Sequence, residues 1–173
     1  MTLDSEFVEI ESQFKAKAGS DYAASRGEFL NGKIMANYLG FHFIDAAEVI
    51  FFTEEGQFDS ERTNDVLGMR LSKVDNAVIP GFYGSLPDGS VKTFSRGGSD
   101  ITGSIVSRAA RVDMYENWTD VSGFLVTDPR IIDNPAPIDT ITYRELRELS
   151  YMGASVLHED AIFPVRREGI PIN

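Results

Sequence analysis

The sequence predicts an α/β fold, a parallel or mixed sheet with helices on its faces. Along the chain, segments with apolar residues at helical spacing alternate with short apolar runs that glycine or proline ends. A glycine-rich stretch, residues 93–104, joins one such run to a helical pattern. The 173 residues are enough for one domain with a sizeable core. Alternation of strands and helices is typical of sheets covered by helices.

The N-terminal half is predicted to begin with two helices. Residues 1–17 place apolar side chains at helical spacing, which predicts an amphipathic helix packed on the core or on a neighbouring element. A second helical pattern runs to Leu39, and Ser25–Glu28 just before it matches the Ser-x-x-Glu capping box. We therefore expect Ser25 and Glu28 to cap that helix. The predictions that follow are a strand region over 41–52, a loop over 53–64, a helix over 62–71 and a buried strand over 77–82.

Residues 93–104 read Thr-Phe-Ser-Arg-Gly-Gly-Ser-Asp-Ile-Thr-Gly-Ser. The two adjacent glycines would let backbone N–H groups approach a ligand without a Cβ in the way. Ser99 or Asp100 would cap the helix that follows, over residues 101–111. Such a helix start favours an anion, and Arg96 adds a planar fork suited to a carboxylate or phosphate. An ordinary glycine turn with a good N-cap fits the same pattern equally well, so both interpretations stay open.

The C-terminal part is predicted to add two helices and two short strands. A strand ends at Thr119–Asp120, and residues 131–138, with two prolines, form an extended surface connection. Thr142–Glu145 is a second capping box that opens a helix. Residues 160–168 form another helix, and 170–172 start a strand. Ligands of α/β sheets bind at the carboxyl ends of strands, where the glycine-rich stretch and the Thr-Asp pair are both expected.

Composition and charge exclude several classes of function. The net charge of −11 argues against broad nucleic-acid binding. No stretch approaches the roughly 18 continuous apolar residues of a membrane helix, and the acidic N-terminus does not resemble a secretory signal. Cysteine is absent, which excludes disulfides and thiolate metal sites and favours a cytoplasmic protein. His42 and His158, like Asp45 and Glu48, have no recognisable metal-ligand spacing, so we expect no metal site built from side chains.

Five motifs together resemble those of the aspartokinases in the amino-acid kinase family. They are Gly81-Phe82-x-Gly84, Ser95-Arg96-Gly97-Gly98-Ser99-Asp100, Thr119-Asp120-Val121-Ser122-Gly123, Thr127-Asp128-Pro129-Arg130 and Gly153-Ala154-Ser155-Val156-Leu157-His158. They occur in the family's order and with its spacing, and Ser25-Arg26-Gly27-Glu28 fits its upstream Ser-x-Gly-Glu element. A lone Arg-Gly-Gly-Ser-Asp would be a weak signal, whereas five ordered motifs are a strong one.

The resemblance implies a three-layer α/β/α sandwich of the amino-acid kinase (carbamate kinase-like) type, incomplete in this chain. Residues 1–173 would be a single domain, part of an aspartokinase catalytic domain. Residues 1–20 would be an N-terminal helix that matches loosely, and residues 21–173 the substrate- and nucleotide-binding portion. The family's N-terminal Lys-x-Gly-Gly strand and its C-terminal regulatory ACT domains have no counterpart in these residues. We therefore expect a piece of a catalytic domain that is inactive alone.

The resemblance also implies the reaction, ATP-dependent phosphorylation of the β-carboxylate of L-aspartate in lysine, threonine and methionine biosynthesis. Phosphoryl transfer suits such a site because it needs positioning and charge neutralisation more than covalent chemistry. Mg²⁺ would arrive with ATP, held chiefly by the phosphates. The implied partners are L-aspartate and ATP, without nucleic acid or membrane, and a homo-oligomer is expected.

By the family pattern, five residues would bind the substrate. Arg96 would grip a carboxylate of aspartate, with Ser99 donating a hydrogen bond to it. Glu28 would meet the α-ammonium group. Gly97 and Gly98 would leave room for the substrate and the transferring phosphate.

The same pattern assigns a catalytic residue and a nucleotide site. Asp100 would organise the groups around the transfer, notably the family's catalytic lysine. Two departures fall here, because Leu125 stands where many members have Tyr and Ser155 where many have Lys. The nucleotide site would be lined by Thr119, Asp120, Gly123, Leu125, Asp128 and Arg130.

Two other hypotheses stay open. One is another amino-acid kinase, which acts on a different carboxylate or a carbamate. Arg96 together with Glu28 argues against it, since the pair suits a substrate with both a free carboxylate and a free ammonium group. The other is a non-catalytic fragment that binds an anion or a nucleotide.

Overall fold

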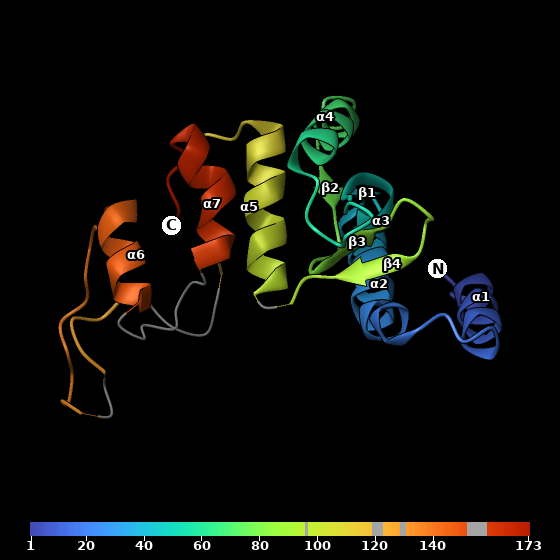
Figure 1. The fold of residues 1–173 in the computed structure, drawn as a ribbon, viewed down its shortest axis with the longest axis horizontal. Coiled ribbons are helices and arrows are strands. Elements are labelled where there is room, and N and C mark those ends of the chain that lie inside the picture. Colours follow the sequence, from blue (N-terminus) through green and yellow to red (C-terminus); the bar gives the residue numbers. More distant parts are fainter. Residues whose placement is uncertain (96, 119–122, 129–130, 152–158) are drawn as a thin grey trace.

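The computed structural model describes residues 1–95, 97–118, 123–128, 131–151 and 159–173 (Figure 1). This part of the chain contains both helices and short strands, as the sequence predicts, but they do not alternate regularly, since two or three elements of one kind often follow each other. In order, the elements are α1 (Asp4–Lys15), α2 (Ser20–Leu39), β1 (His42–Phe43), α3 (Ala46–Val49), α4 (Ser60–Leu71), β2 (Ala77–Val78), β3 (Tyr83–Ser85), β4 (Val91–Thr93), α5 (Gly98–Ala110), α6 (Tyr143–Tyr151) and α7 (Glu159–Glu168).

The described β structure consists of two small paired units and a few bridges. β1 and β2 are parallel, with His42 opposite Ala77, and β3 and β4 are antiparallel, with Tyr83 opposite Thr93. Phe51 forms a parallel bridge with Ser85, which brings the chain after α3 against β3. The described strands thus form two separate two-stranded sheets, one parallel and one antiparallel.

The strand region predicted over 41–52 is wrong in its middle, where the structure has the short helix α3. The carboxylate of Asp45 accepts a hydrogen bond from the backbone N–H of Ala47 at 3.0 Å and caps this helix. A residue that interrupts an apolar run can therefore start a helix rather than break a strand. Similarly, Asp59 accepts from the N–H of Arg62, so α4 begins at Ser60, inside the predicted loop.

One predicted capping box is wrong and the other is confirmed. α2 begins at Ser20, so Ser25 and Glu28 lie inside the helix, and the buried Ser25 hydroxyl donates to the carbonyl of Tyr22 at 2.8 Å. At α6, the N–H of Thr142 donates to Glu145 Oε2 at 2.9 Å, and the N–H of Glu145 donates to Thr142 Oγ1 at 3.2 Å. This reciprocal pair is the arrangement that the sequence predicts.

The main core gathers where α2, α3, α4, β3 and α5 meet. α5 lies between α4 and α7 (Figure 1), and the buried hydroxyl of Ser104 on α5 accepts from the N–H of Val165 on α7 at 3.2 Å. A parallel bridge between Tyr115 and Ile172 joins the C-terminus to the segment after α5. The buried cluster comprises Phe29, Ile44, Ala46, Val49, Ile50, Leu67, Tyr83, Ile101 and Ile105.

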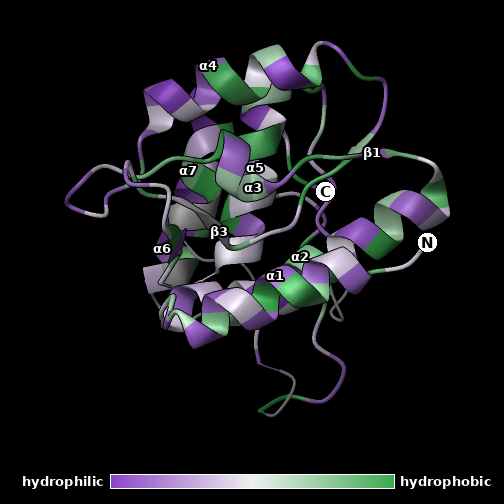
Figure 2. Ribbon diagram, turned by 90° about the vertical axis from the view of Figure 1, so that its right-hand side faces the viewer, coloured by the Kyte–Doolittle hydropathy of each residue, from purple (hydrophilic) through white to green (hydrophobic). Residues whose placement is uncertain are grey.

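The N-terminal helix α1 lies to one side of this core and contacts the neighbouring helix α2 (Figure 1). Hydrophobic and hydrophilic residues are interspersed along α1 (Figure 2), and none of its residues is buried. An ion pair joins Lys33 to Glu6 at 2.6 Å, and the rings of Phe14 and Tyr22 meet edge to face at 6.1 Å. Among the described helices, none combines the length and apolarity needed to cross a membrane.

Candidate functional site

The two adjacent glycines of the glycine-rich stretch, Gly97 and Gly98, form the glycine turn at the start of α5. Gly97 occupies the N-cap position in the left-handed region, with φ of 56°, and α5 begins at Gly98. The prediction that Ser99 or Asp100 caps the helix is wrong, because both residues lie in its first turn and no side chain of the described residues caps it. Ser99 is exposed and Asp100 is half-buried. The start of α5 thus retains the N–H groups that favour an anion.

The loop between β2 and β3 packs directly against this turn. Phe82 has a φ of 62°, which is uncommon for a bulky residue, and its carbonyl accepts from the N–H of Phe94 at 2.9 Å. A Cβ added to Gly98 would lie 2.5 Å from the Cβ of Phe82, and one added to Gly81 would lie 3.1 Å from the Cα of Ser99. The structure therefore brings the Gly81–Gly84 motif and the glycine turn together, and both need glycine to approach so closely.

Helix α2 is tied to the same region at its N-terminal end. The carboxylate of Asp21 accepts from the N–H of Thr93 at 3.2 Å and lies 3.4 Å from Lys92 Nζ. Burial alone would raise the pKa of Asp21, but the Thr93 N–H and the Lys92 charge lower it overall. Glu28 lies further along α2 with an exposed side chain, and it has no hydrogen bond or ion pair to any described residue.

Sequence reasoning missed a buried cation on α2 itself, Arg26. Arg26 is 8% exposed, and its guanidinium carbon lies 4.4 Å from the ring centre of Tyr22, 4.5 Å from that of Phe29 and 5.6 Å from that of Tyr83. Tyr22 and Phe29 stand four residues before and three after Arg26, a spacing that places all three on one helix face. This spacing of an arginine between two aromatic residues is the sequence signal that could have predicted the contact. Arg26 therefore packs α2 against Tyr83 of β3, the residue that follows Phe82 in the chain.

Asp100 lies beside a half-buried tyrosine, Tyr115. Tyr115 packs on Gly103, where a Cβ would collide with the ring, and its hydroxyl lies 3.4 Å from the Asp100 carbonyl oxygen. Burial, and to a lesser degree the Asp100 carboxylate, raise the pKa of Tyr115 to about 12. Tyr115 is therefore a neutral phenol at physiological pH. The first turn of α5 is a favourable place for the Asp100 charge, because the N-terminal end of a helix carries a partial positive charge.

Several predicted site residues fall outside the described part of the chain. These are Arg96, Thr119, Asp120 and Arg130. Ser155 and His158 of the fifth family motif also lie outside the described residues. Of the other predicted nucleotide residues, Gly123 is exposed with φ of 83°, and Leu125 is exposed and forms an antiparallel bridge with Pro137. The Asp128 carbonyl accepts from the N–H of Ile131 at 2.9 Å. Gly123, Leu125 and Asp128 thus lie along one segment.

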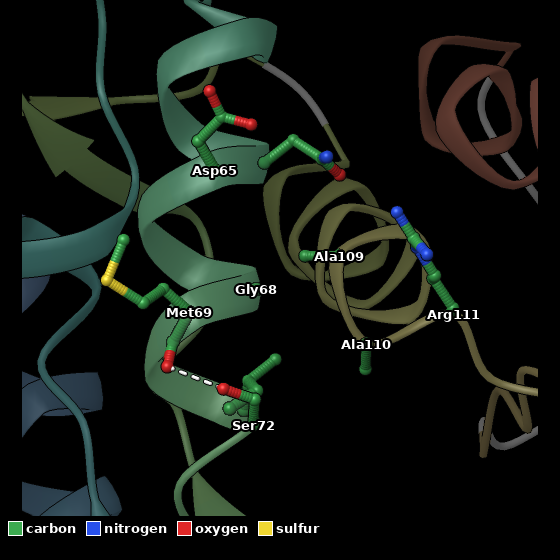
Figure 3. Close-up of a pocket in the computed structure, with 9 residues that line it drawn as sticks. Asp65, Gly68, Met69, Ser72, Ala109, Ala110 and Arg111 are labelled. Carbon is green, nitrogen blue, oxygen red and sulfur yellow. Dashed lines mark hydrogen bonds between the residues drawn. The ribbon is translucent and has the colours of Figure 1, made fainter.

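A cavity of about 450 Å³ lies away from the glycine turn, between α4 and the C-terminal end of α5 (Figure 3). Gly68 permits a close approach of the helices, because a Cβ there would lie 3.2 Å from the Ala109 carbonyl oxygen. Asp65 and Arg111 stand on the two sides of the cavity (Figure 3). The 13 residues of α5 span about 20 Å, so this cavity is separate from the glycine turn. Among the described residues that line it, none is a predicted site residue.

The chain is similar to known aspartokinases over nearly its whole length. Aspartokinase 3 of Bacillus subtilis is 41% identical over 162 residues, which cover 88% of this chain and 35% of that protein. Aspartate kinase of Clostridium acetobutylicum has a crystal structure that is 58% identical with a TM-score of 0.94, and the match covers all of this chain and 40% of the other. Escherichia coli aspartokinase III, in complex with aspartate and ADP, is 25% identical with a TM-score of 0.85, over 99% of this chain and 43% of the other.

These matches confirm the predicted amino-acid kinase fold and the resemblance to aspartokinases. This chain spans about a third of the length of its Bacillus relative. The model of the amino acid kinase family matches residues 2–173. Since the family model, the fold and the ordered motifs agree, the chain belongs to the amino acid kinase family.

Proposed function

We propose that this chain is the substrate- and nucleotide-binding portion of a kinase that transfers a phosphoryl group from ATP to the β-carboxylate of L-aspartate. The observation that carries the proposal is the close packing of Phe82 against Gly98, which joins two motifs of the family beside an uncapped helix start. The complex of the Escherichia coli relative with aspartate and ADP supports the choice of substrate and nucleotide. The product, an aspartyl phosphate, would enter lysine, threonine and methionine biosynthesis.

The proposed substrate roles follow the family pattern. Arg96 would bind a carboxylate of aspartate bidentately, and Ser99, exposed in the first turn of α5, would donate a hydrogen bond to it. Glu28 would bind the α-ammonium group, which its exposed carboxylate, without a hydrogen-bond or ion-pair partner among the described residues, favours. Gly97 and Gly98 would leave room for the substrate and the transferring phosphate.

Asp100 would organise the groups around the transfer, from the first turn of the helix that carries Ser99. Mg²⁺ would arrive with ATP and be held chiefly by its phosphates. Among the described residues, no group of three or more acidic or histidine side chains could hold a metal ion. The residues that line the nucleotide site would be Thr119, Asp120, Gly123, Leu125, Asp128 and Arg130.

The domain organisation and assembly belong to the same proposal. Residues 1–173 would form one domain, with residues 1–20 as an N-terminal helix and residues 21–173 as the binding portion. The support for this division is the position of α1, which lies beside the core without a buried residue. A homo-oligomer and a cytoplasmic location also stay predictions.

The test is phosphoryl transfer by the full-length protein that contains this chain. With ATP, Mg²⁺ and L-aspartate, hydroxylamine should trap the acyl phosphate as a hydroxamate, and glutamate in place of aspartate should give none. Arg96→Ala should lower kcat/KM for aspartate at least 100-fold, while Arg130→Ala should act mainly on the KM for ATP. Turnover of another carboxylate in place of aspartate would favour a different amino-acid kinase. Calorimetric binding of ATP without any turnover would favour a non-catalytic nucleotide-binding fragment.

A further inference from the structure

The side chain of Thr102 links the first turn of α5 to the loop that precedes β3. Its Oγ1 donates to the carbonyl oxygen of Gly98 at 2.8 Å and accepts from the backbone N–H of Phe82 at 3.0 Å. Thr102 is 3% exposed, so water has little access to either bond. The single hydroxyl proton and one of the lone pairs are both used, which fixes the hydroxyl orientation.

Phe82 is the residue that this hydroxyl holds. Its φ of 62° is a conformation that bulky side chains rarely adopt, and such strain persists only where the surroundings determine it. The N–H of Phe82 is bonded to Thr102 and its carbonyl to the N–H of Phe94, the residue that leads from β4 into the glycine turn. Both polar groups of this strained residue are therefore held by elements that flank the turn.

The position of Phe82 also restricts where the glycine turn can lie. A Cβ on Gly98 would lie 2.5 Å from the Cβ and 2.8 Å from the Cα of Phe82, so the two backbones are in direct contact. Gly97 and Ser99, on either side of Gly98, cannot keep their places if Phe82 moves toward the turn. The distance between the loop and the start of α5 thus depends on the Thr102 hydroxyl.

We propose that Thr102 is a positioning residue of the substrate site, which holds Phe82 in the left-handed conformation and thereby sets the place of Gly97, Gly98 and Ser99. This inference rests on the proposed function, because the site that it positions is the aspartate site. Thr102 takes no part in the chemistry and does not touch the substrate. Loss of the Thr102 hydroxyl would weaken aspartate binding because it changes the geometry of the glycine turn.

Ser107 offers a matched control on the same helix. Its hydroxyl donates to the carbonyl of Gly103 at 2.8 Å, four residues back, as the Thr102 hydroxyl does to Gly98. Ser107 is 6% exposed, and in the described part of the chain its hydroxyl holds no loop. Ser107→Ala therefore removes the bond that both residues share, whereas Thr102→Val also removes the link to Phe82.

The experiment compares Thr102→Val, Thr102→Ser and Ser107→Ala in the full-length protein, by steady-state kinetics. Thr102→Val should raise the KM for aspartate at least tenfold and leave the KM for ATP within twofold. Thr102→Ser, which keeps the hydroxyl, should stay within threefold of the unmodified protein for both substrates, and Ser107→Ala within twofold. An equal rise in both KM values, or an unchanged KM for aspartate in Thr102→Val, overturns the proposal.

Hydrogen exchange at the Phe82 amide gives a second readout that needs no activity. Thr102→Val should speed exchange there at least tenfold, and Ser107→Ala should leave it unchanged; equal exchange in the two variants overturns the inference. If the unmodified protein does not phosphorylate aspartate, the proposed function fails, while this readout still tests the positioning of the loop. Should Thr102→Val fail to fold, Thr102→Cys, with a weaker donor and acceptor, allows the same comparison.

Discussion

The hydroxyl of Tyr83 donates a 2.7 Å hydrogen bond to Oδ1 of Asp45, across 38 residues of chain. The same carboxylate oxygen accepts from the N–H of Ala47 and caps α3. Tyr83 is completely buried, and burial, followed by the Asp45 charge, raises the pKa of Tyr83 above its usual value. One oxygen atom thus fixes both the start of α3 and the place of β3, beside the residue that packs on the glycine turn.

Tyr83→Phe should destabilise the protein by about 2 kcal/mol, because it removes a partly buried hydrogen bond to a carboxylate. Urea unfolding measures the loss. Tyr115→Phe is the control, because its hydroxyl lies 3.4 Å from its acceptor and makes a weak bond. Equal losses in the two variants would show that the Asp45 bond contributes nothing specific.

Gly98→Ala should lower stability by about 3 kcal/mol, because the added methyl group would overlap the backbone and Cβ of Phe82. The same variant should lose aspartate binding in calorimetry. Gly27→Ala is its counterpart in the upstream motif, since a Cβ there meets nothing within 4 Å. Gly27 lies inside α2, so this second variant should be more stable by about 0.5 kcal/mol. A tolerated Gly98→Ala would contradict the described packing.

The packing of α1 against α2 should weaken as the pH falls. Hydrogen bonds from Lys33 and then Ser5 lower the pKa of Glu6 from 4.5 to about 2 in the folded protein. The Glu6 carboxylate binds a proton more tightly when α1 is not packed on α2. The stabilisation of the packed helix is therefore complete above pH 4.5 and is lost as the pH falls toward 2. Hydrogen exchange of the α1 amides across this range measures the loss.

Two lysine variants test this explanation. Lys33→Met should remove the acid dependence of α1, because the pair with Glu6 is gone. Lys15→Met removes an exposed pair with Glu11 within α1 and should leave the dependence unchanged. An acid transition that survives in Lys33→Met would assign the titration to another group.

Thr142→Ala should weaken the start of α6 by about 1 kcal/mol, because the N–H of Glu145 loses its acceptor. Faster hydrogen exchange at Glu145 measures this change. Glu145→Gln should keep most of the cap, since the amide oxygen still accepts from Thr142. A larger effect in Glu145→Gln than in Thr142→Ala would argue that the charge of Glu145, not the reciprocal bonding, stabilises the helix.

Local patterns predicted the helices well and their starting points less well. The box at Thr142–Glu145 formed as predicted, whereas the equivalent pattern at Ser25–Glu28 lies inside α2, because five further residues before Ser25 are also helical. The strand predicted over 41–52 became α3 in its middle, where a bond from distant Tyr83 reinforces the Asp45 cap. Competing local choices are decided by packing, which a short window of sequence does not contain.

The sequence by itself determined the α/β class, the order of the family motifs and, through them, membership of the amino acid kinase family. These features depend on periodicity and residue order, which the chain carries locally. Only the tertiary structure decided that the Arg26 guanidinium stacks on the ring of Tyr83, that Thr102 bonds to the Phe82 N–H, and that Phe82 packs on Gly98. Those contacts join residues far apart in the chain, and their distances follow from how the whole core packs at close to crystalline density.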